Sequence, residues 1–97
     1  MPAFITLYKL TEQGVKNIKT APERITAGIQ AFEATGGKVH GFWATTGEYD
    51  YVAIGESPSE EAGVAFALAQ AAQGNVRTTT LRAYSVAEFA AIVKRIP

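Results

Sequence analysis

Three short segments divide the chain, and in each a serine or threonine is followed three residues later by glutamate, just ahead of a helical pattern of apolar residues. The segments are residues 20–23, 57–60 and 85–88. In such a capping box the hydroxyl and the carboxylate bind the free backbone N–H groups at a helix start. The sequence therefore predicts three helices, and it indicates that the three glutamates are caps and not catalytic acids.

Extended runs rich in β-branched and aromatic residues separate these helices. They cover residues 3–9, 38–46, 49–56 and 76–84. A short helical turn is also expected over residues 11–18. The resulting β-α-β-β-α-β order with an added C-terminal helix predicts a ferredoxin-like α+β fold, in which the helices cover one face of an antiparallel four-stranded sheet. With 97 residues and no repeat or linker, we expect a single domain over residues 1–97.

The two middle strands carry apolar residues on both faces, in Phe42-Trp43-Ala44 and in residues 51–54. This pattern is typical of sheets that are covered on both sides. Only one layer of helices is available, so we expect a second copy of the sheet to cover the other face. The sequence thus predicts a homodimer or a higher homo-oligomer.

Composition argues against several classes of partner and cofactor. Nine basic residues balance nine acidic ones, so no basic stripe is available for nucleic acid. The chain has no cysteine and one histidine, which argues against a metal centre, and we expect no cofactor. No run approaches the roughly 18 apolar residues of a membrane span, and no signal peptide is evident. We therefore expect no membrane association and a cytoplasmic location.

A two-residue turn at Gly47 and Glu48 is predicted between the second and third strands. With this turn, His40 faces Gly55 and lies ~17 Å along the ladder from Asp50. A catalytic Asp–His pair requires hydrogen-bond contact, so none is expected within one chain.

One end of the predicted sheet gathers polar and aromatic residues from three strands. They are Tyr8, Lys9, Tyr49, Asp50, Asn75 and Arg77. Two interpretations stay open. In the first, the Asp50 carboxylate stabilises the fold by pairing with Lys9, Arg77 or backbone N–H groups near the turn. In the second, the cluster is a ligand site in which a basic side chain holds an anionic group and a tyrosine donates a hydrogen bond.

A second candidate pocket lies at the opposite end, where His40, Trp43 and Arg82 would line a barrel. The competing interpretation is that the large aromatic residues there form the core of an interface. His40 and Asp50 are the candidates for a catalytic base.

Four segments share their pattern with a known family. They are Gly47-x-Tyr49-Asp50 on the predicted hairpin, residues 74–84, residues 11–19 and residues 36–38. These segments resemble the GYD-domain family over nearly the whole chain, with Tyr84 where the family has phenylalanine. The family is similar to the dimeric α+β barrel group, which implies two sheets that face each other across a homodimer. That group includes monooxygenases, haem enzymes, isomerases and ligand-sensing modules, so the resemblance leaves the activity open.

Two hypotheses about function follow. In the first, the chain is a ligand-binding or interaction module that binds a small anionic or aromatic molecule or another protein. Alternatively, it is a metal-free, monooxygenase-like or isomerase-like barrel enzyme for an aromatic or enolic compound, with Trp43 shaping the cavity. A cavity between the two sheets would favour the enzyme, and a filled interface would favour the module.

Overall fold

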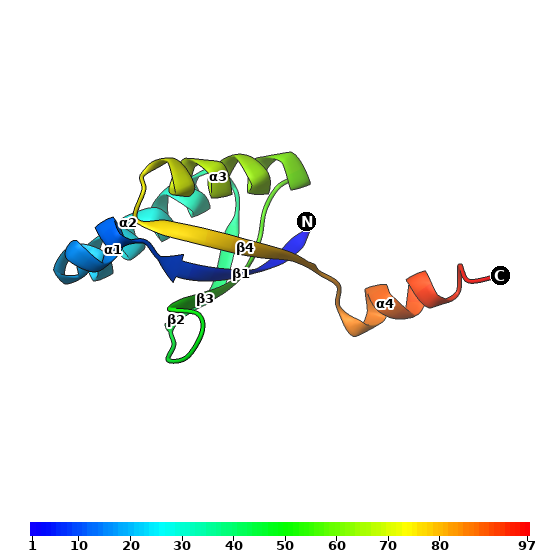
Figure 1. Ribbon diagram of the computed structural model, residues 1–97. Coiled ribbons are helices and arrows are strands. Elements are labelled where there is room, and N and C mark those ends of the chain that lie inside the picture. Colours follow the sequence, from blue (N-terminus) through cyan, green and yellow to red (C-terminus); the bar gives the residue numbers. More distant parts are fainter.

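The structure, a computed structural model, describes residues 1–97 and confirms the ferredoxin-like α+β fold. Its elements are β1 (Ala3–Leu10), α1 (Glu12–Lys16), a 3-10 turn η1 (Ile18–Thr20), α2 (Ala21–Ala34), β2 (Lys38–Ala44), β3 (Tyr51–Glu56), α3 (Glu60–Ala72), β4 (Val76–Ala83) and α4 (Val86–Val93). The four strands form one antiparallel sheet in the order β2-β3-β1-β4. Helices α2 and α3 lie on one face of this sheet (Figure 1).

The capping box predicted for the last helix is confirmed. Ser85 accepts the N–H of Glu88 at 3.1 Å, and the Glu88 carboxylate accepts the N–H of Ser85 at 2.9 Å. The other two glutamates, Glu23 and Glu60, make no such bond. The interpretation of all three as caps is therefore correct only for Glu88.

The first two helices begin differently from the prediction. Thr20 precedes α2, but its hydroxyl donates to the carbonyl of Asn17 at 3.1 Å and caps nothing. The cap of α3 is Ser59, which accepts the N–H of Ala62 at 3.1 Å, and not Ser57. Ser57 is fully buried and its N–H donates to the backbone before β1, so it holds the end of β3 to the start of the chain.

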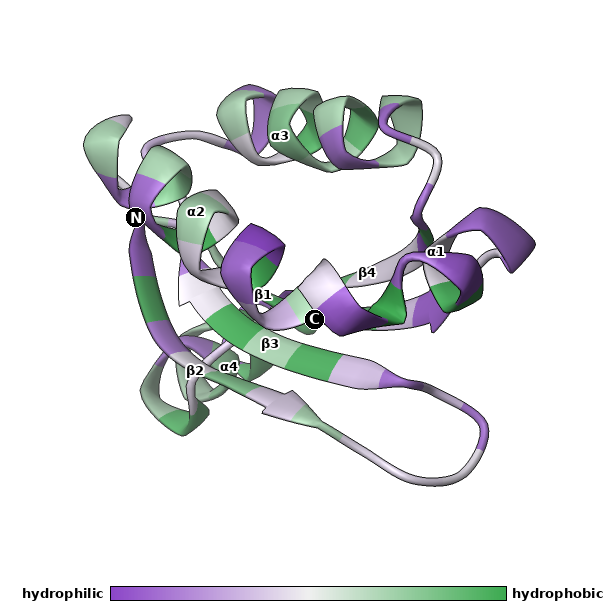
Figure 2. Cartoon of the chain, turned by 90° about the vertical axis from the view of Figure 1, so that its left-hand side faces the viewer, coloured by the Kyte–Doolittle hydropathy of each residue, from purple (hydrophilic) through white to green (hydrophobic).

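The connection between β2 and β3 is wider than the predicted two-residue turn. The strands separate after Ala44 and rejoin at Tyr51, so residues 45–50 form the loop that extends from the sheet in Figure 2. The Thr45 hydroxyl donates to the Tyr49 carbonyl at 2.6 Å, which withdraws that carbonyl from the strand ladder. Gly47 has a φ of 105°, a conformation that glycine adopts at no steric cost.

A β-bulge at His40 overturns part of the predicted register. Trp43 faces Val52 as expected, but the register shifts between Val39 and Gly41, and Val39 takes the place opposite Gly55 that was predicted for His40. Two close approaches accompany the bulge. The Trp43 ring lies against Gly41, and the Lys38 carbonyl lies 2.6 Å from where a Cβ of Gly55 would be. At Gly55 the neighbouring atom belongs to the backbone, so only glycine leaves room there.

The C-terminal segment stands apart from the rest of the chain. Helix α4 lies beyond the end of β4, away from α2 and α3 (Figure 1). Every residue from Tyr84 to Pro97 is exposed. The molecule is accordingly elongated, with principal extents of 52 × 30 × 20 Å.

Candidate functional site

The six residues predicted to meet at the sheet end are divided between the two faces of the sheet. Tyr8 and Lys9 are neighbours on β1, and successive side chains of a strand point to opposite faces. Tyr8 points towards the helices, where its ring contacts Phe42 and Tyr51 at centroid distances of 5.5 and 6.1 Å. Lys9 lies on the helix-free face. Tyr8 and Lys9 are therefore not on the same side of the sheet, and the tyrosine beside Lys9 is Tyr49.

Asp50 contacts the backbone and neither of its predicted basic partners. Its Oδ2 accepts the N–H of Leu10 at 2.8 Å, and its own N–H donates to the Tyr8 carbonyl at 2.8 Å. Its carbonyl in turn accepts the N–H of Thr45 at 2.8 Å. Asp50 thus joins the loop of the hairpin to the end of β1, which is the arrangement that the fold-stabilising interpretation describes.

The basic residues of the cluster lie on the exposed surface. Lys9 Nζ is 3.5 Å from Glu48 Oε1 and 5.4 Å from the centre of the Tyr49 ring. Arg77 is the cross-strand partner of Lys9 and makes no ion pair. Like charges directly opposite one another repel, so Glu48 partly offsets this repulsion.

Asn75 precedes the edge strand β4 and binds residues near the end of β1. Its side-chain oxygen accepts a bond from Gln13 Nε2 at 3.1 Å, and its carbonyl accepts the N–H of Thr11 at 3.1 Å. These contacts hold α1 to the loop before β4.

The second predicted pocket does not assemble within the chain. Trp43 is on the helix-free face and is 51% exposed. Arg82 lies at the far end of β4, where it pairs with Glu60 at 3.3 Å and stacks on the Tyr84 ring with its Cζ 4.5 Å from the centroid. His40 Nε2 instead contacts Glu56 Oε2 at 2.7 Å, on an exposed part of the surface.

Sequence reasoning missed the His40–Glu56 pair because it considered Asp50 as the carboxylate partner. In the observed pairing Lys38 faces Glu56, which places Glu56 diagonally across from His40. Diagonal neighbours on adjacent strands lie within reach of long side chains. In the predicted register Glu56 faces Val39 and lies on the other side of the sheet from His40, so only the bulge brings the two side chains together.

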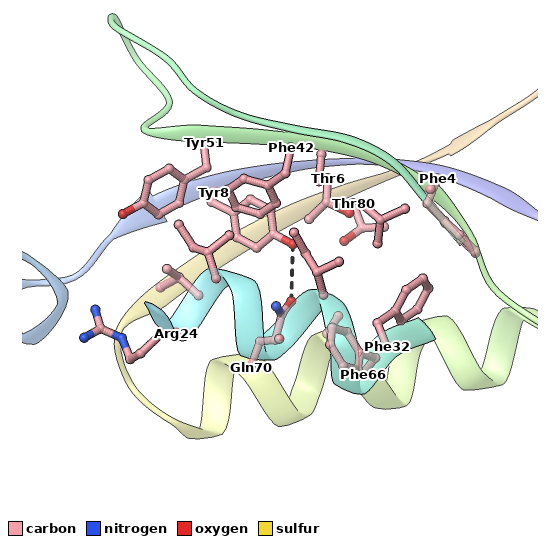
Figure 3. Close-up of a pocket in the computed structure, with 18 of the residues that line it drawn as sticks. Phe4, Thr6, Tyr8, Arg24, Phe32, Phe42, Tyr51, Phe66, Gln70 and Thr80 are labelled. Carbon is pink, nitrogen blue, oxygen red and sulfur yellow. Dashed lines mark hydrogen bonds between the residues drawn. The ribbon is translucent and has the colours of Figure 1, made fainter. Parts of the chain in front are cut away.

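A cavity of about 150 Å³ lies between the sheet and the two helices α2 and α3 (Figure 3). Its principal side chains are Phe4, Tyr8, Phe32, Phe42, Phe66 and Gln70. The Tyr8 hydroxyl spans the space and donates to Gln70 Oε1 at 3.4 Å. Burial raises the pKa of Tyr8, and the bond to Gln70 offsets part of that effect. This cavity is within one chain and is distinct from the space expected between two sheets.

The helix-free face of the sheet and α4 both expose large apolar side chains. On the sheet these are Trp43, Ile54 and Leu81, at 51, 37 and 47% exposure. On α4 they are Val86, Phe89, Ile92 and Val93. In the chain alone, nothing covers either surface.

The structure also limits two kinds of site. It brings together no group of three histidine, cysteine, aspartate or glutamate side chains that could hold a metal ion. None of its helices combines the length and the apolar character that a membrane span requires.

Comparison with known proteins gives two matches. The family model of the GYD domain matches residues 4–93. A protein of Thermus thermophilus named "Glutamine synthetase and cystathionine beta-lyase binding protein" is 36% identical over 95 residues, which cover 97% of this chain and 100% of that protein. No solved structure matches the chain.

Proposed function

The chain belongs to the GYD-domain family, and we propose that it is a self-associating interaction module whose partners are other proteins. The observation that carries this proposal is the large area of apolar surface that the isolated chain leaves in contact with water.

The accessible surface of the chain is too large for a self-sufficient monomer. It amounts to 6575 Å² for a mass of 10.3 kDa. Folded monomers of this mass expose about 5,400 Å², so the excess is about 1,200 Å². One partner in a standard protein interface contributes ~800 Å². The excess therefore matches one chain's share of a substantial interface.

The helix-free face of the sheet supports pairing with a second copy. It is apolar across three strands, through Trp43 on β2, Ile54 on β3 and Leu81 on β4. A nearly neutral chain with a two-sided sheet can pair such a face with itself about a two-fold axis. Burial of apolar surface in this pairing would stabilise the dimer by about 25 cal/mol per Å².

Helix α4 extends this surface beyond the sheet. It is only eight residues long, and helices of fewer than ~12 residues are marginal in water unless they pack against something. Its apolar residue Phe89 is 59% exposed, and Tyr84 connects it to the end of β4. We propose that α4 packs on the second copy and forms one continuous interface with the sheet.

The relative from Thermus thermophilus supports binding of further proteins. Its name assigns to it two partners, glutamine synthetase and cystathionine beta-lyase. We propose that this chain likewise binds a metabolic enzyme, with the glutamine synthetase and cystathionine beta-lyase of its own source organism as the first candidates.

Sedimentation velocity of the full chain tests self-association. We expect a mass that is a multiple of 10.3 kDa at ~100 μM and a shift towards monomer on dilution. Trp43→Lys places an unpaired charge in the proposed interface and should give monomer with an unchanged circular dichroism spectrum. The matched control is Val64→Lys on α3, where the side chain has a similar exposure of 56%. A monomeric wild type, or equal effects of the two lysines, would overturn the proposed interface.

Surface plasmon resonance tests the binding of enzymes. The full chain is immobilised, and purified glutamine synthetase and cystathionine beta-lyase from the same organism are passed over it, with serum albumin as the control. We expect saturable binding of at least one enzyme below ~10 μM, the range of specific transient complexes. If neither enzyme binds while the chain still self-associates, the proposed partner class is wrong and the self-association stands.

A further inference from the structure

We propose that the cavity between the sheet and helices α2 and α3 is a binding site for a small neutral molecule with one aromatic ring and a hydrogen-bonding carbonyl or amide group. This site is separate from the interaction surface described above, since it lies on the other side of the sheet. Three independent features of the cavity support the proposal.

The first feature is the open packing between the two layers. Phe4, Phe32, Phe42 and Phe66 point into the space between sheet and helices, yet each remains only half-buried. Protein interiors contain few voids larger than a water molecule. A void of about 150 Å³ with an aromatic and aliphatic lining is of the size that accepts a single benzene ring.

The second feature is a vacant position on α2. Gly28 lies in the interior of this helix and lines the cavity, and a Cβ added there would meet no atom within 4 Å. Glycine weakens a helix interior relative to alanine because of its greater chain entropy. No close contact in the chain requires glycine at this position, whereas an additional molecule in the cavity would use the space.

The third feature is a polar pair that retains unused hydrogen-bonding capacity. The 3.4 Å between Tyr8 Oη and Gln70 Oε1 exceeds the 2.7–2.8 Å typical of O–H···O bonds. The Gln70 amide nitrogen donates no bond, and the Tyr8 hydroxyl accepts none. Both groups point towards one another across the cavity in Figure 3. A ligand carbonyl oxygen beside the pair would accept from the Gln70 amide nitrogen, and a ligand N–H would donate to the Tyr8 hydroxyl oxygen.

The charge of the lining argues for a neutral ligand. Arg24 is the only charged residue of the lining, and Figure 3 shows it at the edge of the cavity, away from Gln70. Its Nη1 already donates to the Asn17 carbonyl at 3.0 Å and to the Thr20 hydroxyl. Burial also raises the pKa of Tyr8, so its hydroxyl remains a neutral donor at physiological pH. A buried anion would have no cation beside it.

An NMR titration of the isotopically labelled full chain with benzamide tests the site. We expect saturable shifts of resonances from Tyr8, Phe42 and Gln70 below about 10 mM benzamide. Benzoate, which has the same ring but a negative charge, should bind at least ~10-fold more weakly. Absence of shifts with benzamide overturns the site, and tighter binding of benzoate overturns the assignment to neutral ligands.

Variants of the lining separate a binding site from a packing defect. Gly28→Leu fills the vacant position and should abolish benzamide binding without loss of thermal stability, whereas Ala27→Leu on the exposed side of α2 should leave binding unchanged. Tyr8→Phe should weaken binding about threefold to tenfold, the usual value of one hydrogen bond. Should leucine disturb folding, Gly28→Ala provides the smaller change and should weaken binding at unchanged or higher stability. Benzamide affinity that Gly28→Leu or Gly28→Ala leaves at the wild-type value would contradict the proposal.

Discussion

Replacing Asp50 by alanine should destabilise the domain by about 1–2 kcal/mol, because it removes one carboxylate that joins the hairpin loop to β1. Asp50 Oδ2 accepts the backbone N–H of Leu10 at 2.8 Å, a length typical of a charge-assisted bond. The variant leaves that N–H without a partner where the chain is half-buried. The perturbation thus measures how much this contact contributes to the fold.

The magnitude follows from the kind of bond and from its burial. Hydrogen bonds to charged groups contribute about 1.5–3 kcal/mol, and partial access of water to Leu10 places this one near the lower limit. For a domain of this size, 1 kcal/mol corresponds to a change of about 4–8 °C in Tm. Asp50→Asn keeps an acceptor oxygen but loses the charge, so about half of the effect should remain, ~0.5–1 kcal/mol.

Urea unfolding followed by far-ultraviolet circular dichroism is the assay. All variants are compared at one protomer concentration, because self-association makes apparent stability depend on concentration. Glu48→Ala is the matched control on the same loop. Its carboxylate is 71% exposed and 3.5 Å from Lys9, so its loss should cost less than ~0.5 kcal/mol.

Equal stability of Asp50→Ala and wild type would refute the reasoning. If the stability were unchanged but the affinity for a ligand or protein collapsed, Asp50 would belong to a binding site and not to the fold-stabilising cluster. An Asp50→Asn variant as unstable as Asp50→Ala would show instead that the charge, and not the acceptor, carries the effect.

Further predictions concern two glycines, the N-cap of the C-terminal helix and the buried tyrosine. Gly14→Ala should cost at least ~2 kcal/mol in urea unfolding because its Cβ would overlap a backbone carbonyl before β4, whereas Gly28→Ala should stabilise by about 0.5–1 kcal/mol. Ser85→Ala should destabilise α4 by about 1 kcal/mol, which backbone carbon chemical shifts would show as a lower helix content. The hydrogen bond from the Ser85 N–H lowers the pKa of Glu88 from 4.5. The stabilisation from this cap should therefore be complete above pH 4.5 and be lost as the pH falls through the lowered pKa. A Glu88→Gln variant that shows the same acid transition would contradict this. Burial raises the pKa of Tyr8 above 10.0, so the unfolded chain loses this proton first and stability should fall as the pH rises past 10.0, with a smaller slope in Tyr8→Phe.

The order of elements could be predicted from local signals, and the candidate site only in part. Turn and cap residues and β-branched runs located every strand end within two residues, the largest differences being at the hairpin. The site required knowledge of which face each side chain occupies. Tyr8 and Lys9 were assigned to one cluster because they end the same strand, but the pleat of β1 sends them to opposite faces.

The hairpin shows why register is harder to predict than strand order. A single bulge residue changes the partner of every residue beyond it. Here the bulge coincides with two close contacts, of the Trp43 ring with Gly41 on the same strand and of the Lys38 carbonyl with Gly55 on the adjacent strand. No periodic sequence pattern indicates such a contact. His40 was therefore predicted to lie far from Asp50, and its contact with Glu56 was not predicted.

By itself, the sequence determined the order of the strands and main helices and the apolar character of both faces of the sheet, because each depends on local propensity and on the period of apolar residues. Only the tertiary structure decided that Tyr8 and Gln70 meet across a cavity, that Asp50 binds the backbone of β1, and that α4 stands free of its own sheet. These features depend on the distance between packed layers and on contacts between residues far apart in the chain, which local patterns do not specify.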